Sequence, residues 1–148
     1  MPDPERERLL AAYRATRYIV RDAGAEVAVR IGERSPALDA LLAAHGAERG
    51  VFITAWNPGS RPQPRAANAA AAARMEAALA AAGRRWLPHE GRGEAGGWSE
   101  EGFFLLDMPA EAALDLAVRF GQNAVVEARR GAPARLLLTP LMPTDRTG

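Results

Sequence analysis

The chain changes character at residues 52–60, which read FITAWNPGS. The apolar and β-branched residues at the start of this stretch predict a buried strand, and the Pro-Gly pair ends it. Between the strand and the breaker stand Trp56 and Asn57. Polar groups delivered from the end of a strand are common in binding and catalytic sites. We therefore expect a site here, although no motif in the chain is specific enough to name a reaction.

Outward from this stretch, strands and helices follow in an order that predicts an α+β fold. The βαββαβ order is ferredoxin-like and covers about residues 51–128. In such a sheet the strands lie in the order fourth, first, third, second, which brings the loops 56–64, 89–98 and 121–123 to one end. The expected elements are strand 51–56, helix 65–82, strand 85–89, a glycine-rich loop 91–97, strand 103–107, helix 109–120 and strand 123–128.

The residues around this core predict further elements. Helical spacing is expected over 4–14, a β-hairpin turns at 22–24, and a short helix begins after Ser35 and ends at Gly46. These N-terminal elements are expected to cover the open face of the sheet, and residues 135–139 predict an edge strand that could pair across a homodimer. We expect one domain over 1–148, with loose ends at 1–4 and 140–148.

Composition excludes several classes of function. The 148 residues are 48% hydrophobic, with 19 basic residues, all arginine, against 18 acidic ones and a net charge of +1. This balance argues against a nucleic-acid or membrane partner. Because Lys and Cys are absent, Schiff-base and thiolate chemistry are excluded. No long apolar segment or signal peptide is evident, so we expect a cytoplasmic protein without a cofactor. His45 and His89 stand far apart without a carboxylate cluster, and we expect no metal.

Side chains of the two loops could form a pocket for a polar small molecule. Trp56 could stack on a planar group, and the amides of Asn57, Gln122 and Asn123 both donate and accept hydrogen bonds. The alternative is structural. In that interpretation the asparagines cap turns, Trp56 fills the core and Gln122 satisfies backbone groups.

The entrance to the helix at 65–82 is a candidate site for an anion. Ser60 and Arg61 precede this helix, whose free amides carry positive potential, and Arg61 or Arg65 could grip a phosphate or carboxylate. The alternative is a Pro-rich connector with solvated arginines. Asn68 falls on the buried stripe of the helix, so we predict that its amide hydrogen-bonds the backbone at Trp56 and Asn57 or a ligand.

His89 and Glu90 form the one obvious pair for proton transfer, and they support an enzyme as an alternative function. Adjacent strand residues face opposite sides, which favours a solvated strand end instead. Ser60 could act as a nucleophile only if His89 reached it. His45, near a helix C-terminus, is interpreted as a surface residue.

A third function class is an RNA or protein interaction module. Aromatic residues at Phe52 and at Phe103 and Phe104 resemble the paired strands of an RNA-recognition sheet. Glu101 stands where a basic residue is expected, and N-terminal elements that covered the sheet would prevent base stacking.

Three stretches carry a resemblance to a known family. They are residues 53–58 (ITAWNP) with the following Asn68, residues 91–93 (GRG) and residues 120–124 (FGQNA). From about Tyr13 to Val126 the chain resembles the bacterial domain-of-unknown-function family numbered 3293. The resemblance implies a compact bacterial domain in which these loops matter, and it implies no substrate. The Ala-rich run 69–73 departs from the more charged helix of the family.

Overall fold

A single antiparallel sheet of seven strands organises the described part of the chain, in the order β2-β1-β4-β5-β3-β6-β7. The computed structural model describes residues 1–94 and 98–145. Its elements are α1 (Pro4–Arg14), β1 (Thr16–Asp22), β2 (Ala25–Val29), α2 (Pro36–Ala44), β3 (Arg49–Ile53), the 3-10 turn η1 (Pro58–Ser60), α3 (Arg65–Ala81), β4 (Trp86–Gly93), β5 (Ser99–Leu106), α4 (Ala110–Arg119), β6 (Ala124–Arg129) and β7 (Arg135–Leu138).

The four strands β3 to β6, between residues 49 and 129, lie side by side as β6-β3-β5-β4. This is the fourth, first, third, second order expected from the sequence, and the α+β class is confirmed. Several strand boundaries were wrong. β3 ends at Ile53 and not at Trp56, and β5 begins at Ser99, four residues before the predicted start. β4 continues to Gly93, so Gly91 and Gly93 are strand residues and not part of a loop. Gly91 pairs with Glu100 on one side and with Tyr18 on the other, since two flanking strands supply its hydrogen-bond partners. Residues 95–97 of the predicted loop lie outside the described residues.

The N-terminal hairpin extends the sheet and does not cover its open face, which corrects the sequence prediction. β1 pairs with the outer edge of β4, where Val20 lies opposite His89. The long β4 offers a full row of backbone groups, and pairing satisfies them better than an overlying hairpin would. β7 forms the opposite edge, as predicted.

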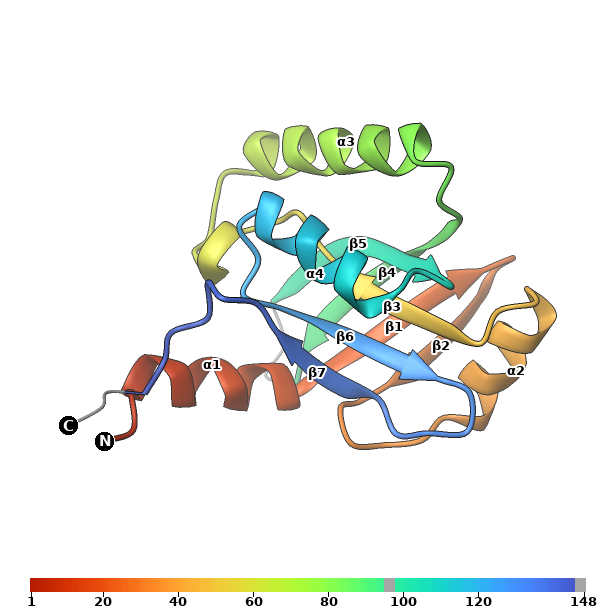
Figure 1. Ribbon diagram of the computed structural model, residues 1–148, viewed down its shortest axis with the longest axis horizontal. Helices are drawn as coiled ribbons and strands as arrows, with labels where there is room; N and C mark the ends of the chain where they lie inside the picture. Colours follow the sequence, from red (N-terminus) through yellow and green to blue (C-terminus); the bar gives the residue numbers. More distant parts are fainter. Residues whose placement is uncertain (95–97, 146–148) are drawn as a thin grey trace.

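The sheet is strongly curled, so that its two edges approach each other. Just beyond β2, Ile31 forms an isolated bridge with Ala134, and the Gly32 backbone N–H donates to the Ala134 carbonyl at 2.7 Å. Figure 1 shows the consequence: α3 and α4 lie on the convex side of the sheet, whereas α1 and α2 lie on the concave side at opposite ends. The curl therefore creates one enclosed face with a helix at each end.

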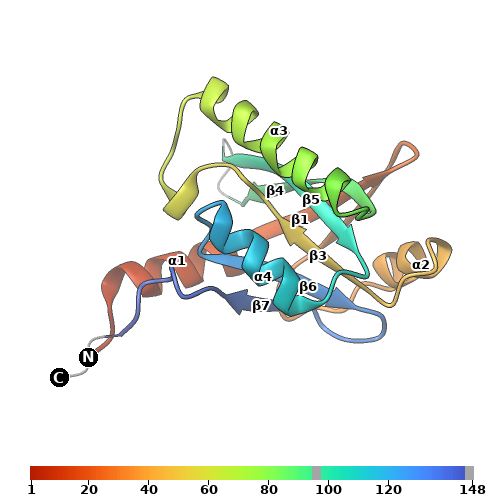
Figure 2. The same ribbon diagram turned by 45° about the horizontal axis from the view of Figure 1, so that its top comes forward.

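Alternating strand residues supply the two cores. Val51, Ile53 and Leu105 face the convex side and pack under Met75 of α3 and Leu116 of α4. The two helices cross this face side by side in Figure 2. On the concave side, Phe52, Phe104 and Val126 pack with the leucines of α2. The part of the chain that the structure describes has no helix long and apolar enough to span a membrane.

The ends of the chain contact each other, and some residues within the segments predicted as loose ends, 1–4 and 140–148, are held in place. Asp3 caps α1 by accepting from the Arg6 backbone N–H at 2.9 Å, and Arg6 Nη1 donates to the Pro143 carbonyl at 3.0 Å. Met142 is buried at 3% exposure. The C-terminal segment therefore fixes α1 on the concave face. Residues 146–148 lie outside the described range.

Candidate functional site

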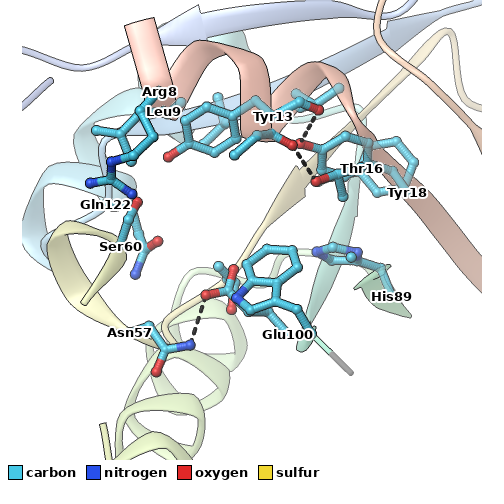
Figure 3. A pocket seen from close by; sticks show the side chains of 18 residues that line it. Arg8, Leu9, Tyr13, Thr16, Tyr18, Asn57, Ser60, His89, Glu100 and Gln122 are labelled. Atoms are coloured by element: carbon cyan, nitrogen blue, oxygen red, sulfur yellow. Dashed lines mark hydrogen bonds between the residues drawn. The ribbon is translucent and has the colours of Figure 1, made fainter. Parts of the chain in front are cut away.

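A cavity of about 140 Å³ lies on the concave face beneath α1. α1 forms its roof through Leu9, Ala12 and Tyr13, and strands β1, β3, β4, β5 and β6 form its walls. Figure 3 shows side chains from these elements pointing into a common space. Its lining residues with polar groups include Arg8, Tyr13, Thr16, Tyr18, Thr54, Asn57, Ser60, His89, Trp98, Glu100 and Gln122.

Asn57 is held in one orientation by hydrogen bonds from behind. Its side-chain Oδ1 accepts from Asn68 Nδ2 at 3.0 Å and from the Gln63 backbone N–H at 2.9 Å. Asn68 Oδ1 in turn accepts from the Asn57 backbone N–H at 2.9 Å, which confirms the hydrogen bond predicted for Asn68. Since Oδ1 of Asn57 has two donors, its Nδ2 must turn toward the cavity. The left-handed backbone of Asn57 (φ 48°, ψ 61°) is one that asparagine tolerates.

The Glu100 carboxylate accepts a hydrogen bond from the Asn57 side-chain amide. Asn57 Nδ2 donates to Glu100 Oε2 at 2.9 Å, as drawn in Figure 3. No ion pair to Glu100 is found within residues 1–94 and 98–145. Burial raises the pKa of Glu100 to about 7, and the hydrogen bond from Asn57 only partly opposes this effect. The carboxyl group is therefore poised between its neutral and charged forms near neutral pH.

His89 is part of the cavity wall and not a solvated strand end, so that interpretation of the sequence was wrong. It is only 5% exposed, and its ring lies 5.2 Å from the Phe52 ring and 6.5 Å from the Tyr18 ring, centroid to centroid. Burial lowers the pKa of His89 to about 4, although the backbone carbonyls of Glu90 and Ile53 favour the protonated ring. His89 is thus neutral at pH 7. Its Nδ1 is buried without a hydrogen-bond partner among the described residues.

The predicted gathering of two distant loops is confirmed. The Gly59 backbone N–H donates to the Gly121 carbonyl at 2.7 Å, and Gln122 Nε2 donates to the Trp56 carbonyl at 3.1 Å. Asn123 Nδ2 donates to Ser60 Oγ at 3.3 Å. Asn57, Ser60 and Gln122 all line the cavity, while Asn68 and Asn123 support them from behind. Gln122 also satisfies backbone carbonyls, as the structural alternative proposed.

Three predicted residues lie elsewhere. Trp56 follows the last convex-facing residue of β3 and lines a separate depression beside α3, with Arg65 and Phe103. Arg61 is exposed and does not line the cavity. Arg65, in the first turn of α3, lines the depression beside that helix and not the cavity.

Glu90 faces away from the cavity, as the alternation of strand residues predicts. Its carboxylate is bound by Arg21, by Arg92 at 3.1 Å and by Ser99 at 2.6 Å. Burial alone would raise the pKa of Glu90, but the hydrogen bonds from Ser99, Arg21 and Arg92 overcome it and lower the pKa to about 2. A carboxylate this acidic is a poor proton donor or acceptor near neutral pH, so the predicted His89 and Glu90 pair does not form.

The aromatic strands do not present an RNA-binding surface. Phe52 and Phe104 are 2% and 0% exposed in the concave core, and Phe103 is 6% exposed in the convex core. Buried rings cannot stack on bases.

The sequence interpretation missed Tyr13 and Glu100. Burial raises the pKa of the Tyr13 hydroxyl, a hydrogen bond with Ser60 opposes this, and the nearby charge of Glu100 adds to it. Tyr13 falls within the helix predicted at 4–14, and nothing around it in the sequence marks it as a site residue. The sequence did carry a sign of Glu100. Every second residue of a strand faces the same side, and Glu100 thus shares a face with Phe104 and Leu106, which are both buried. A charged residue on the buried face of a strand is rare without a purpose.

His45 lies outside the site, where its Nε2 is 2.8 Å from Asp22 Oδ2. No cluster of three or more His, Asp or Glu side chains that could hold a metal occurs in the described ranges.

The site and fold define an α+β protein with a small cavity on the concave face of a curled sheet, lined by apolar and aromatic side chains with a few polar groups among them. The family model described as "Protein of unknown function (DUF3293)" matches residues 53–125, and through this segment the chain belongs to that family. The matched segment carries Asn57, Asn68, Glu100 and Gln122. Neither the curated proteins nor the solved structures yielded a match.

Proposed function

We propose that the protein binds a small polar molecule in the cavity beneath α1. The observation that carries this proposal is the chain of hydrogen bonds from Asn68 through Asn57 to Glu100. It fixes one amide donor and one carboxylate at a cavity wall, and groups held in place before a ligand arrives bind it at lower entropic cost. A fold that needed only stability would gain more from an apolar side chain at position 100.

The volume limits the ligand to a small molecule. A cavity of about 140 Å³ is close to the engineered cavity of ~150 Å³ that holds benzene in another protein. The roof helix presents Tyr13 and Leu9 to the ligand, while Gln122 and Ser60 stand at the loop end. The ligand is thus expected to carry few non-hydrogen atoms and at least one hydrogen-bond donor for Glu100.

An anionic ligand, which the sequence also suggested, is disfavoured by this charge distribution. Arg8 is the one basic side chain among the described lining residues besides neutral His89, and its side chain is 69% exposed. An anion would meet the Glu100 carboxylate, and like charges at short range repel. We therefore retain the polar ligand and set the anion aside.

The proposal is tested by thermal shift with a panel of neutral, cationic and anionic molecules of about eight non-hydrogen atoms or fewer. We expect some members to raise the melting temperature of the wild type and to lose this effect in Glu100→Gln. The matched control is Glu101→Gln, because Glu101 is the next residue and lines the convex depressions instead of the cavity. If no molecule raises the melting temperature of the wild type, the proposal fails.

A second candidate function, a small enzyme, is favoured by one observation. A carboxyl group with a pKa of about 7 that faces a cavity is suited to general acid or base catalysis. In this proposal Glu100 takes the role that the sequence suggested for His89 and Glu90. Its test is turnover with a pH dependence near 7 that is lost in Glu100→Gln and kept in Glu90→Gln.

We also propose that residues 51–128 form a ferredoxin-like core. The strand order β6-β3-β5-β4 and the antiparallel pairing support this assignment, as do helices α3 and α4 on one face.

A further inference from the structure

We infer that the ligand of the cavity beneath α1 is a small organic ammonium ion, held by the Glu100 carboxylate within aromatic walls. This inference rests on the proposed function and adds the charge and chemical class of the ligand. Two independent features of the cavity support it, the unbalanced charge of Glu100 and the rings that surround it.

The carboxylates of the sheet differ in how their charge is neutralised. Glu127 is fully buried and is bound by Arg135 at 2.7 Å and Arg49 at 3.7 Å. Glu90 is bound by Arg21 and Arg92. Glu100 differs, because within the described ranges it has an amide partner, Asn57, and no arginine. Arginine side chains thus neutralise Glu127 and Glu90, whereas the charge of Glu100 can be neutralised by a bound cationic ligand.

The second feature is the set of aromatic walls. Tyr13, Tyr18, Phe52 and Trp98 all line the cavity. The Tyr18 and Phe52 rings lie 5.5 Å apart, centroid to centroid, so they form a continuous surface. Aromatic faces attract organic ammonium ions, and several rings around one carboxylate are a recurrent arrangement for binding them. Inorganic divalent cations are usually held by several oxygen ligands that include carboxylates, and Glu100 is the one carboxylate among the described lining residues.

His89 fits the same ligand. Its ring extends the aromatic wall beside Phe52, and burial lowers its pKa to about 4. At neutral pH it therefore adds no positive charge that would repel an ammonium ion. Burial raises the pKa of Glu100 in the free protein, and a bound cation would lower this pKa again because it favours the charged carboxylate.

The test compares two probes of nearly equal shape and different charge. Choline carries a trimethylammonium group, and 3,3-dimethylbutan-1-ol replaces its nitrogen with carbon. Isothermal titration at pH 8 should show choline binding to the wild type at least about tenfold more tightly than the alcohol. Glu100→Gln should remove this preference, whereas Glu101→Gln should keep it.

A pH series on the wild type makes the test independent of the variants. Choline affinity should fall by about tenfold or more from pH 8 to pH 5.5, because protonation removes the charge of Glu100, while affinity for the alcohol should stay nearly constant. If the alcohol binds as tightly as choline at pH 8, the inference fails and the proposed function stands. If neither probe binds and the panel of polar molecules also gives no thermal shift, the proposed function itself fails.

Discussion

The two ends of the concave face are built from the same sheet and closed in different ways. At one end Leu38, Leu41 and Leu42 of α2 enter the curl and pack on Phe104. At the other end α1 buries only Leu9 fully, and a cavity remains beneath it. The filled end has the close packing that stabilises a fold, whereas the hollow end holds Glu100, Asn57 and His89.

The end filled by α2 shows that the concave face can be covered without leaving a cavity or placing polar groups in it. α2 shows that this chain can fill the curl with leucine, and a polar, incompletely filled cavity is less stable than a packed apolar one. We propose that the cavity under α1 is left unfilled because it binds a ligand. Substitutions at the filled end should mainly lower stability, and substitutions at the hollow end should mainly weaken ligand binding.

The largest effect is expected at the filled end. Leu42→Ala should lower the free energy of unfolding by about 2 to 5 kcal/mol, because a fully buried side chain is removed from close packing. Leu9→Ala should cost less, since Leu9 already borders a cavity, but should weaken probe binding. Urea unfolding and titration measure both effects. An equal or greater loss of stability in Leu9→Ala would contradict the comparison.

Two glycines on neighbouring strands offer a matched pair. A Cβ at Gly102 would lie 2.1 Å from the Ile53 carbonyl oxygen, so Gly102→Ala should cost about 1 to 3 kcal/mol. At Gly91 the nearest atom would be Thr16 Cγ2 at 3.5 Å, which is ordinary contact. Gly91→Ala should therefore change stability by less than about 1 kcal/mol and weaken choline binding by adding a methyl group to the cavity. Equal destabilisation of the two variants would speak against the described β4 and β5 packing.

The support behind Asn57 is tested by Asn68→Ala. This change leaves the Asn57 backbone N–H and Oδ1 without their partner, and we expect a loss of about 1 to 3 kcal/mol together with weaker binding. Glu76→Ala is the control, because Glu76 is exposed on the same helix. Thermal unfolding and choline titration report the two effects. Asn68→Ala with unaltered affinity would mean that Asn57 does not need this support to bind a ligand.

The smallest effect is a difference in pH dependence. The folded-state pKa of Glu100 is raised to about 7 from 4.5, so the folded protein binds more protons than the unfolded chain between these values. The contribution of Glu100 to stability is thus present below about pH 4.5 and is lost as the pH rises to 7. Relative to Glu100→Gln, the wild type should become less stable over this window in urea unfolding. A constant difference between the two proteins would contradict the burial of Glu100.

Much of the fold was predictable because local patterns agreed with tertiary packing. The helix at 4–14 follows a capping Asp3 and has Pro4 at its first position, and the helix at 36–44 follows a capping Ser35 and has Pro36 at its first position. The length of β4 was not predictable in this way. Gly91 and Gly93 are typical of loops, and pairing with β1 and β5 overrides that tendency.

The site was predictable only in part. Asn57, Ser60 and Gln122 were found because polar residues at strand ends and helix ends gather when the topology is known. The prediction placed Trp56 in the cavity, but Trp56 lies on the convex face beside α3. The sequence does not show that β3 ends at Ile53, so it does not show which face a later residue takes. Tyr13 joined the cavity through long-range docking of α1, which no local pattern encodes.

The most direct test is an NMR titration of the Glu100 side-chain carboxyl carbon, with and without choline. The account predicts a midpoint near pH 7 in the free protein, set by burial beneath α1, and a lower midpoint when choline is bound. A midpoint near the ordinary value of 4.5 that choline does not change would contradict it.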